Sequence, residues 1–75
     1  IHPRELFKHA IALGAAAVIF AHNHPTGDVS PSLADIQATN DLIQSGELLK
    51  IKVIDHIIIG DHAYYSIQSK KLHAI

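Results

Sequence analysis

The chain has 75 residues and a mass of 8.2 kDa, which is enough for one small domain and excludes a second. It contains no cysteine, so disulfides, thiolate ligands and cysteine nucleophiles are excluded, and any metal site would need His, Asp, Glu or water. The formal net charge is -1 with dispersed lysines and arginines, which gives no electrostatic signal for nucleic acid, whereas seven histidines are unusually many.

No membrane segment is expected in this chain. The longest uncharged apolar run, residues 11–21, is far shorter than the roughly 20 residues that a membrane-spanning helix needs, and we expect it to be core. No signal peptide is recognisable, and the lack of cysteine suits a reducing cytosol, so we expect a cytoplasmic protein. The sequence begins at Ile1 and contains no Met, so we expect a fragment of a longer protein.

The first half of the chain predicts a helix, a strand and a loop. Pro3 suits the first turn of a helix, and apolar residues recur at a helical period up to Gly14, which predicts an amphipathic helix over residues 3–13. Residues 15–21 form a short apolar run, which is typical of a strand buried on both faces. Residues 22–31 are rich in Asn, Pro, Gly and Asp and predict a loop.

The second half predicts a helix and two strands. Ser30 or Ser32 can cap the helix, and Gly46 either ends it or breaks it. Residues 51–59 are β-branched and predict a strand, which a two-residue turn at Gly60-Asp61 joins to another strand over residues 63–67. The predicted order is helix, strand, helix, strand, strand, an α/β arrangement. The apolar stripe of the second helix is Leu33, Ile36, Leu42 and Ile43.

One segment carries a pattern with chemical meaning. His22 and His24 lie two apart at the end of a predicted strand, so the strand period directs both imidazoles to one side. Ser32 and Asp35 follow at a spacing of three, on one face of the next helix. Two His nitrogens and one Asp oxygen give three ligands, and a catalytic zinc site leaves its fourth position to water. Requiring Ser and Asp at fixed offsets after H-x-H makes a chance match roughly 200 times rarer than for H-x-H alone.

The pattern matches the JAMM motif of JAB/MPN-type metalloproteins. Residues 2–5, 14–21, 22–28 and 55–61 resemble the bacterial RadC branch, so the resemblance covers nearly the whole chain. It implies a cytidine-deaminase-like α/β fold, a three-layer mixed sheet with flanking helices. Residues 1–75 would then be a single domain, the C-terminal part of a RadC-like JAB/MPN domain whose N-terminal strands are missing from this fragment.

The resemblance also implies a zinc-dependent hydrolase. Zn2+ would be held by His22, His24 and Asp35, with Ser32 beside the bound water to stabilise the water or an oxyanion. The family motif has a Glu on an earlier strand as general acid/base, and we expect this Glu upstream of the chain. Glu5 and Glu47 fall near helix ends, so both are expected to be solvated.

Alternatives exist for several of these residues. Ser32 and Asp35 also fit a capping box, which needs no metal and is compatible with one. Asp55 and His56 interrupt an apolar strand and should point to opposite faces; they are either a carboxylate orienting an imidazole beside the site or, as we favour, a polar pair at a strand edge. The remaining histidines, expected to be surface or structural residues, are His2, His9, His62 and His73.

The function that this pattern favours is metal-assisted hydrolysis. The resemblance points to a JAMM-type zinc metallopeptidase that cleaves amide or isopeptide bonds of a peptide or protein substrate through a metal-activated water. The fragment alone would be inactive, because the general acid/base lies outside it. The alternatives are a non-catalytic JAB/MPN-like binding module and a metal-dependent DNA-repair-associated factor, although nuclease sites usually prefer Mg2+ or Mn2+ with oxygen ligands.

Overall fold

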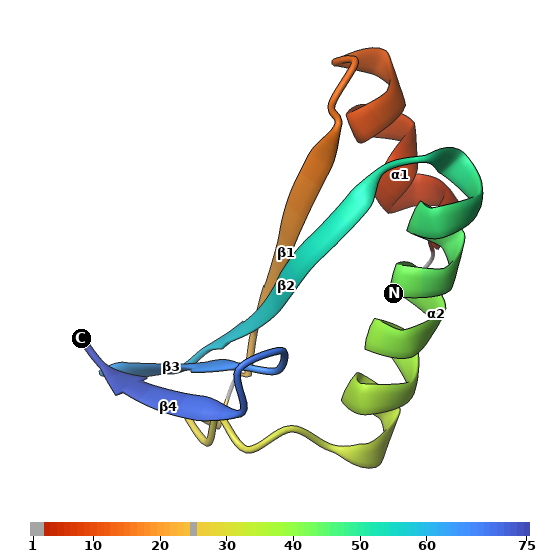
Figure 1. The fold of residues 1–75 in the computed structure, drawn as a ribbon. Coiled ribbons are helices and arrows are strands. Elements are labelled where there is room, and N and C mark those ends of the chain that lie inside the picture. The colour runs from red at the N-terminus through yellow and green to blue at the C-terminus, as the bar shows by residue number, and fades with distance from the viewer. Residues whose placement is uncertain (1–2, 25) are drawn as a thin grey trace.

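The computed structural model describes residues 3–24 and 26–75, and a mixed sheet with two helices accounts for most of them (Figure 1). The strands run in the spatial order β1-β2-β3-β4, with β1 and β2 parallel and the remaining neighbours antiparallel. The predicted α/β class is confirmed. The elements in chain order are α1 (Pro3–Ala12), β1 (Ala17–Asn23), α2 (Leu33–Leu49), β2 (Lys52–Ile59), β3 (Ala63–Ser66) and β4 (Lys71–Ala74).

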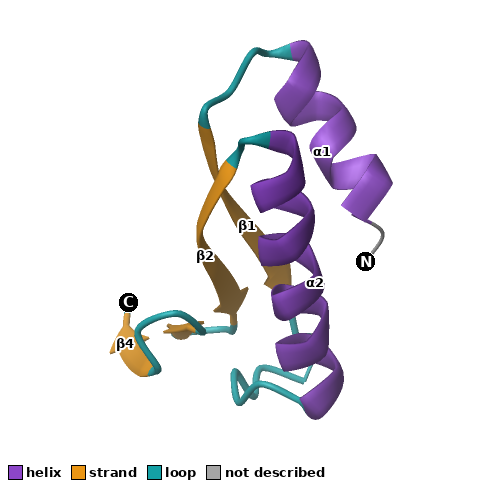
Figure 2. Cartoon of the chain, turned by 45° about the vertical axis from the view of Figure 1, so that its right-hand side comes forward, coloured by secondary structure: helices purple, strands orange, loops and turns teal. Residues whose placement is uncertain are grey.

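Both helices pack against the same face of β1 and β2 (Figure 2). Phe7 of α1 and Phe20 of β1 meet edge to face, with 5.5 Å between their ring centroids. The opposite face carries Ile19, whose side chain is 59% exposed. The prediction that β1 is buried on both faces is therefore wrong for the described residues, because helices cover only one of them. The buried cluster between helices and sheet consists of Phe7, Ala10, Leu42 and Ile51.

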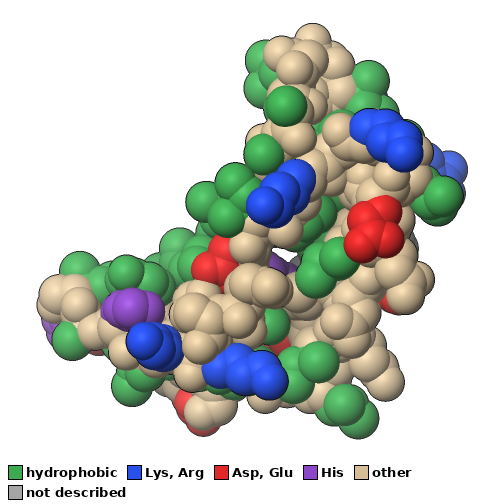
Figure 3. Space-filling model, in the orientation of Figure 1, with side chains coloured by type: hydrophobic (Ala, Val, Ile, Leu, Met, Phe, Trp, Pro, Cys, Tyr) green, Lys and Arg blue, Asp and Glu red, His purple; other side chains and the backbone are tan. Residues whose placement is uncertain are grey.

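Many apolar side chains remain at the surface. Figure 3 shows hydrophobic groups spread over both the helical and the sheet parts of the face drawn. Leu13 and Leu48 are the most exposed of the large ones, at 84% and 85%. Within the described residues, no helix has the length and apolar character needed to cross a membrane.

Helix α2 continues through Gly46, so the predicted break there is wrong. The helix ends only at Leu49, and Lys50 adopts a left-handed conformation with φ of 60°. A side chain at Gly46 would overlap the carbonyl oxygen of Ile51, because the chain turns back over the helix at that point. The N–H of Ile51 donates to the Gly46 carbonyl at 2.8 Å. Glycine is thus required there by close backbone approach rather than by helix termination.

The turn between β2 and β3 lies one residue later than predicted. The Gly60 N–H donates to the Ala63 carbonyl at 2.8 Å, so the two loop residues are Asp61 and His62. Gly60 has no positive φ; a Cβ there would lie 2.7 Å from the carbonyl oxygen of Gly27. Its role is to let the loop after β1 pack closely against the end of β2.

Strand β4 has no counterpart in the sequence-based prediction. It pairs antiparallel with β3, after a turn in which Lys70 has φ of 57°. A left-handed lysine carries no recognisable turn signal, because glycine or asparagine normally occupies such a position. The predicted order of five elements therefore lacks its last strand.

A β-bulge in β2 decides which side chains face the helices. Val18 lies opposite Val53, but Ile19 lies opposite Asp55, so Ile54 is an extra residue on β2. The side-chain alternation shifts by one beyond this point. Val53 packs on the core cluster, and His56, three residues later, is also buried on the helical side.

Candidate metal centre

Three side chains converge where the end of β1 meets the first turn of α2. His22 Nε2 lies 3.4 Å from Asp35 Oδ1, and His24 Nε2 lies 3.1 Å from Asp35 Oδ2. One candidate ligand atom from each of the three lies within 4.8 Å of the others. The side chains are 25%, 20% and 14% exposed in chain order, so the cluster is partly shielded yet open to solvent. The structure thus brings together the three residues singled out from the sequence.

The strand pleat and its extension position the two imidazoles. His22 belongs to β1, and the chain stays extended beyond the strand because the His24 N–H donates to the Ile59 carbonyl at 3.1 Å. Side chains two apart on an extended chain share a face. The ring centroids of His22 and His24 are accordingly 5.0 Å apart.

A capping box fixes the carboxylate. The Asp35 N–H donates to Ser32 Oγ at 3.0 Å, and the Ser32 N–H donates to Asp35 Oδ2 at 2.9 Å. The cap residue is therefore Ser32, as one of the two candidates predicted, and the capping interpretation of Ser32 and Asp35 is confirmed. The same carboxylate faces both imidazoles, so the cap and the cluster share Asp35.

The surroundings of Asp35 favour its ionised form. Burial acts to raise the pKa of this carboxyl group, but the hydrogen bond from the Ser32 backbone, the Ser32 side chain and the nearby His22 and His24 outweigh burial and hold the pKa below its ordinary value. A deprotonated carboxylate is the form that binds a metal ion.

The contacts of the two His24 nitrogens show whether the cluster suits a cation. Its Nδ1 lies 2.6 Å from the carbonyl oxygen of Asp28, which can only accept, so Nδ1 carries a proton. In the neutral ring, Nε2 then directs a lone pair at Asp35 Oδ2, 3.1 Å away. Two electron-pair donors at this distance need a proton or a metal ion between them. The donor set fits a metal.

The types of donor atom also narrow the choice of metal ion. Two imidazoles and one carboxylate suit zinc, which binds such atoms at about 2.0–2.2 Å in tetrahedral sites. Tetrahedral ligand atoms would then lie about 3.3 Å apart. Each imidazole lies at about this distance from one oxygen of the carboxylate, 3.4 Å from Oδ1 for His22 and 3.1 Å from Oδ2 for His24.

His56 is a buried residue that contacts His22 of the cluster. The sequence instead favoured a polar pair of Asp55 and His56 at a strand edge. The ring is only 1% exposed, its Nε2 lies 2.8 Å from His22 Nδ1, and its Nδ1 lies 2.7 Å from Thr39 Oγ1. Burial lowers the pKa of His56, and so does neighbouring His22, against an opposing effect of Asp35 and Asp55. The neutral imidazole is therefore favoured.

Asp55 faces away from the His56 ring and does not orient it. Asp55 Oδ1 accepts the backbone N–H of His56 at 2.7 Å and that of Gln68 at 3.0 Å, and Oδ2 accepts the hydroxyl of Ser66. The expectation of opposite directions is confirmed, while the expected position at a strand edge is wrong because β2 lies inside the sheet. The bulge at Ile54 gives no recognisable sequence signal, and without it His56 could not be assigned to the helical face.

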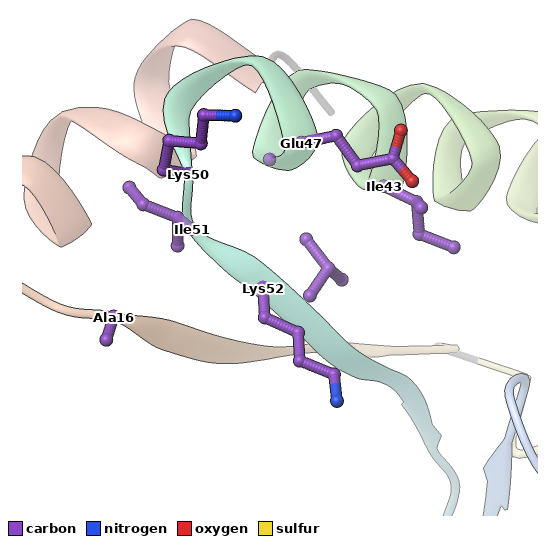
Figure 4. A pocket seen from close by; sticks show the side chains of 8 residues that line it. Ala16, Ile43, Glu47, Lys50, Ile51 and Lys52 are labelled. Atoms are coloured by element: carbon purple, nitrogen blue, oxygen red, sulfur yellow. The ribbon is translucent and has the colours of Figure 1, made fainter.

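Neither glutamate belongs to the converging cluster. Glu5 and Glu47 are both exposed, as expected. Glu47 is twelve residues after Asp35 on α2, which corresponds to about 18 Å along the helix. It borders a pocket of about 560 Å³ near the C-terminal end of α2 that contains none of the three converging residues (Figure 4). A second pocket of about 450 Å³ adjoins His24; its lining is Asn23, His24, Thr26, Gly27, Ile59, Gly60 and Asp61.

The other histidines behave as expected where the structure describes them. His9 and His62 are exposed, and His73 stacks on Tyr64 with 4.7 Å between ring centroids. His2 lies outside the described residues. None of the described three belongs to the converging cluster.

The fold and the cluster define a class of protein, an α/β domain with two imidazoles and a carboxylate that could bind a metal. The family model of the RadC-like JAB domain matches residues 1–72, and the chain belongs to this family. The mixed sheet with two helices is consistent with a JAB-like fold.

Several bacterial proteins are similar to the chain. A UPF0758 protein of Alkaliphilus metalliredigens is 53% identical over 72 residues, which are 96% of this chain and 31% of that protein. A UPF0758 protein of Desulforamulus reducens is 56% identical over 72 residues, with 96% and 32% covered. One of Trichlorobacter lovleyi is 59% identical over 66 residues, with 88% and 29% covered. The chain spans about a third of the length of these relatives.

Proposed function

We propose that the domain is the metal-binding part of a JAMM-type zinc metallopeptidase that hydrolyses amide or isopeptide bonds in a peptide or protein substrate. The observation that carries the proposal is the convergence of two imidazoles and an ionised carboxylate, those of His22, His24 and Asp35, with one candidate ligand atom from each within 4.8 Å of the others. Zinc bound there would lower the pKa of a water molecule toward about 7 and polarise the carbonyl to be cleaved.

The chain's own residues would hold and orient the reacting groups. The cap at Ser32 holds the Asp35 carboxylate against both imidazoles, and the Asp28 carbonyl fixes the proton of His24 on Nδ1. Ser32 Oγ accepts the Asp35 N–H in the cap, and its side chain also stabilises the Asp35 carboxylate. Its hydroxyl proton can rotate from that carboxylate to another acceptor nearby. We infer that this hydroxyl donates to the attacking water or to the oxyanion that develops on the substrate.

The substitution Ser32→Ala tests this role. We expect turnover to fall by about 10²-fold, because the hydroxyl acts in the transition state, while the zinc content stays unchanged. Stability should also fall by about 1 kcal/mol, because the cap is lost. Single-turnover rates and thermal unfolding of the complete protein measure both effects, with exposed Ser30→Ala as the matched control. A loss of stability with an unchanged rate would leave Ser32 as a cap alone.

The hydrolase assignment is tested by assaying the complete, zinc-loaded protein on peptide, isopeptide-linked and nucleic-acid substrates, before and after chelation. We expect cleavage of an amide or isopeptide bond that chelation abolishes and zinc restores. Zinc binding without cleavage of any substrate would favour the non-catalytic binding module. Cleavage of a phosphodiester would favour the DNA-repair-associated factor.

We further infer the three-layer architecture, in which additional strands and helices complete the sheet. Among the described residues, no strand pairs with the outer edge of β1. The face opposite the helices exposes Ile19 and Ile54, at 59% and 47%. An open strand edge beside an apolar face is normally covered in a stable protein.

The substitution Ile19→Asp tests whether that face is covered in the complete protein. A carboxylate placed in a covered interface should lower the free energy of unfolding by about 3–5 kcal/mol, measured by chemical denaturation. Leu48→Asp on α2, where the native side chain is 85% exposed, is the control and should cost at most about 1 kcal/mol. Equal, small effects of both substitutions would contradict the three-layer proposal.

A further inference from the structure

The hydroxyl of Thr39 determines which atom donates in each of the hydrogen bonds that link Thr39, His56 and His22. Thr39 is 4% exposed, and its Oγ1 donates to the Asp35 backbone carbonyl at 2.7 Å. A hydroxyl has one proton, and the carbonyl can only accept it. The second short contact of Oγ1, at 2.7 Å to His56 Nδ1, must therefore be one in which Thr39 accepts. Nδ1 of His56 carries a proton.

The protonation of His56 in turn determines which nitrogen of His22 carries a proton. Its ring is 1% exposed, and its nitrogens contact Thr39 and His22 rather than a carboxylate, so an uncompensated positive charge would be costly there. With the proton on Nδ1, the neutral ring presents a lone pair at Nε2. That nitrogen lies 2.8 Å from His22 Nδ1, so His22 Nδ1–H donates to it.

This hydrogen bond leaves the other nitrogen of His22, Nε2, without a proton. With Nδ1 protonated, the neutral ring has its lone pair on Nε2, which lies 3.4 Å from Asp35 Oδ1 inside the converging cluster. If the hydrogen bonds ran in the opposite direction, Nε2 would carry the proton and could not bind an ion.

We propose that Thr39 and His56 are positioning residues that hold His22 as its Nδ1–H tautomer and so present Nε2 to a metal ion. The hydrogen bonds run from the backbone carbonyl of Asp35 through Thr39 and His56 to His22. The backbone of one proposed ligand therefore helps to orient the ring of another. This inference rests on the proposed metal binding. Hydrogen-bond partners behind a ligating histidine typically change metal affinity by about 10–100-fold.

The substitutions Thr39→Val and Thr39→Ser test this relay, meaning the hydrogen bonds from Thr39 through His56 to His22, in the complete protein. Valine keeps the approximate shape but removes the acceptor for His56 Nδ1–H, so we expect Zn2+ affinity to fall by about 10–100-fold. Serine keeps the hydroxyl and should restore affinity. Ser66→Ala is the matched control, because Ser66 is a buried hydroxyl, 4% exposed, that bonds Asp55 rather than His56. It should destabilise the fold yet leave affinity unchanged.

Two measurements on each variant separate positioning from mere stability. Competition titration with a chromophoric chelator gives the Zn2+ affinity of the folded protein. Long-range proton–nitrogen NMR of the metal-free protein at mildly alkaline pH shows which imidazole nitrogen carries the proton. We expect wild-type His22 and His56 to be protonated on Nδ1, and Thr39→Val to lose this state at both rings.

The inference is overturned if His22 of the metal-free wild type carries its proton on Nε2. It is also overturned if Thr39→Val keeps both the wild-type tautomer and the wild-type affinity. Absence of Zn2+ binding by the wild type would instead refute the proposed metal site, and the NMR tautomers would still decide whether the relay exists.

Discussion

Substitution of His22, His24 or Asp35 by alanine is expected to remove zinc from the complete protein. Each residue supplies one of three candidate ligand atoms, all within 4.8 Å of one another, so loss of one leaves too few protein ligands for a tight zinc site. The affinity should fall by more than the roughly 10–100-fold typical of residues that only support a ligand. Metal analysis after exhaustive dialysis should find about one zinc per wild-type chain and none in the variants.

Controls separate ligation from folding. His9→Ala and His62→Ala alter exposed histidines outside the cluster and should keep the zinc. Asp35→Asn keeps an oxygen that can accept the Ser32 N–H but removes the charge, so it should retain the helix cap and still weaken zinc binding. A triple alanine variant that still carried stoichiometric zinc would refute the ligand assignment.

The 75-residue chain by itself is expected to be inactive even when loaded with zinc. Its only glutamates, Glu5 and Glu47, are exposed, and Glu47 is about 18 Å along α2 from Asp35. Neither belongs to the converging cluster, so we expect neither to move a proton there. Loss of a positioned general acid/base costs about 10²- to 10⁴-fold in rate.

Single-turnover rates of the chain and of the complete protein, at matched zinc content, measure this difference. Amide dispersion in the NMR spectrum of the chain establishes that it is folded during the assay. In the complete protein, Glu5→Gln and Glu47→Gln should leave the rate unchanged. A folded chain as fast as the complete protein would show that one of these two residues, or a water alone, suffices.

The parts of the structure encoded by local signals could be predicted from the sequence. The capping box at Ser32 and Asp35 spans four residues, and its hydrogen bonds form within one helical turn. The spacing of His22 and His24 fixed their common face as soon as the strand was recognised. These two local patterns identified the converging side chains, whereas the packing of α2 beside the end of β1 brings them together.

The parts that depend on contacts between distant segments could not be predicted. The bulge at Ile54 changes the alternation of β2, and it follows from the pairing with β1 rather than from any residue type. His56 therefore reaches Thr39 and His22, residues 17 and 34 positions away in sequence. Gly46 and Gly60 were interpreted as a helix end and a turn, whereas both are sites where another segment approaches too closely for a side chain.

X-ray absorption at the zinc edge of the complete protein tests the central claim most directly, because it reports the atoms around the ion. We predict a first shell of nitrogen and oxygen at about 2.0–2.2 Å, with the outer-shell scattering of two imidazoles and no sulfur, since the three proposed ligands are His22, His24 and Asp35. When zinc is added back in excess to His22→Ala, which should not retain it on dialysis, the signal should contain at most one imidazole ring. Stoichiometric zinc without imidazole scattering in the wild type would contradict the assignment of His22, His24 and Asp35 as its ligands.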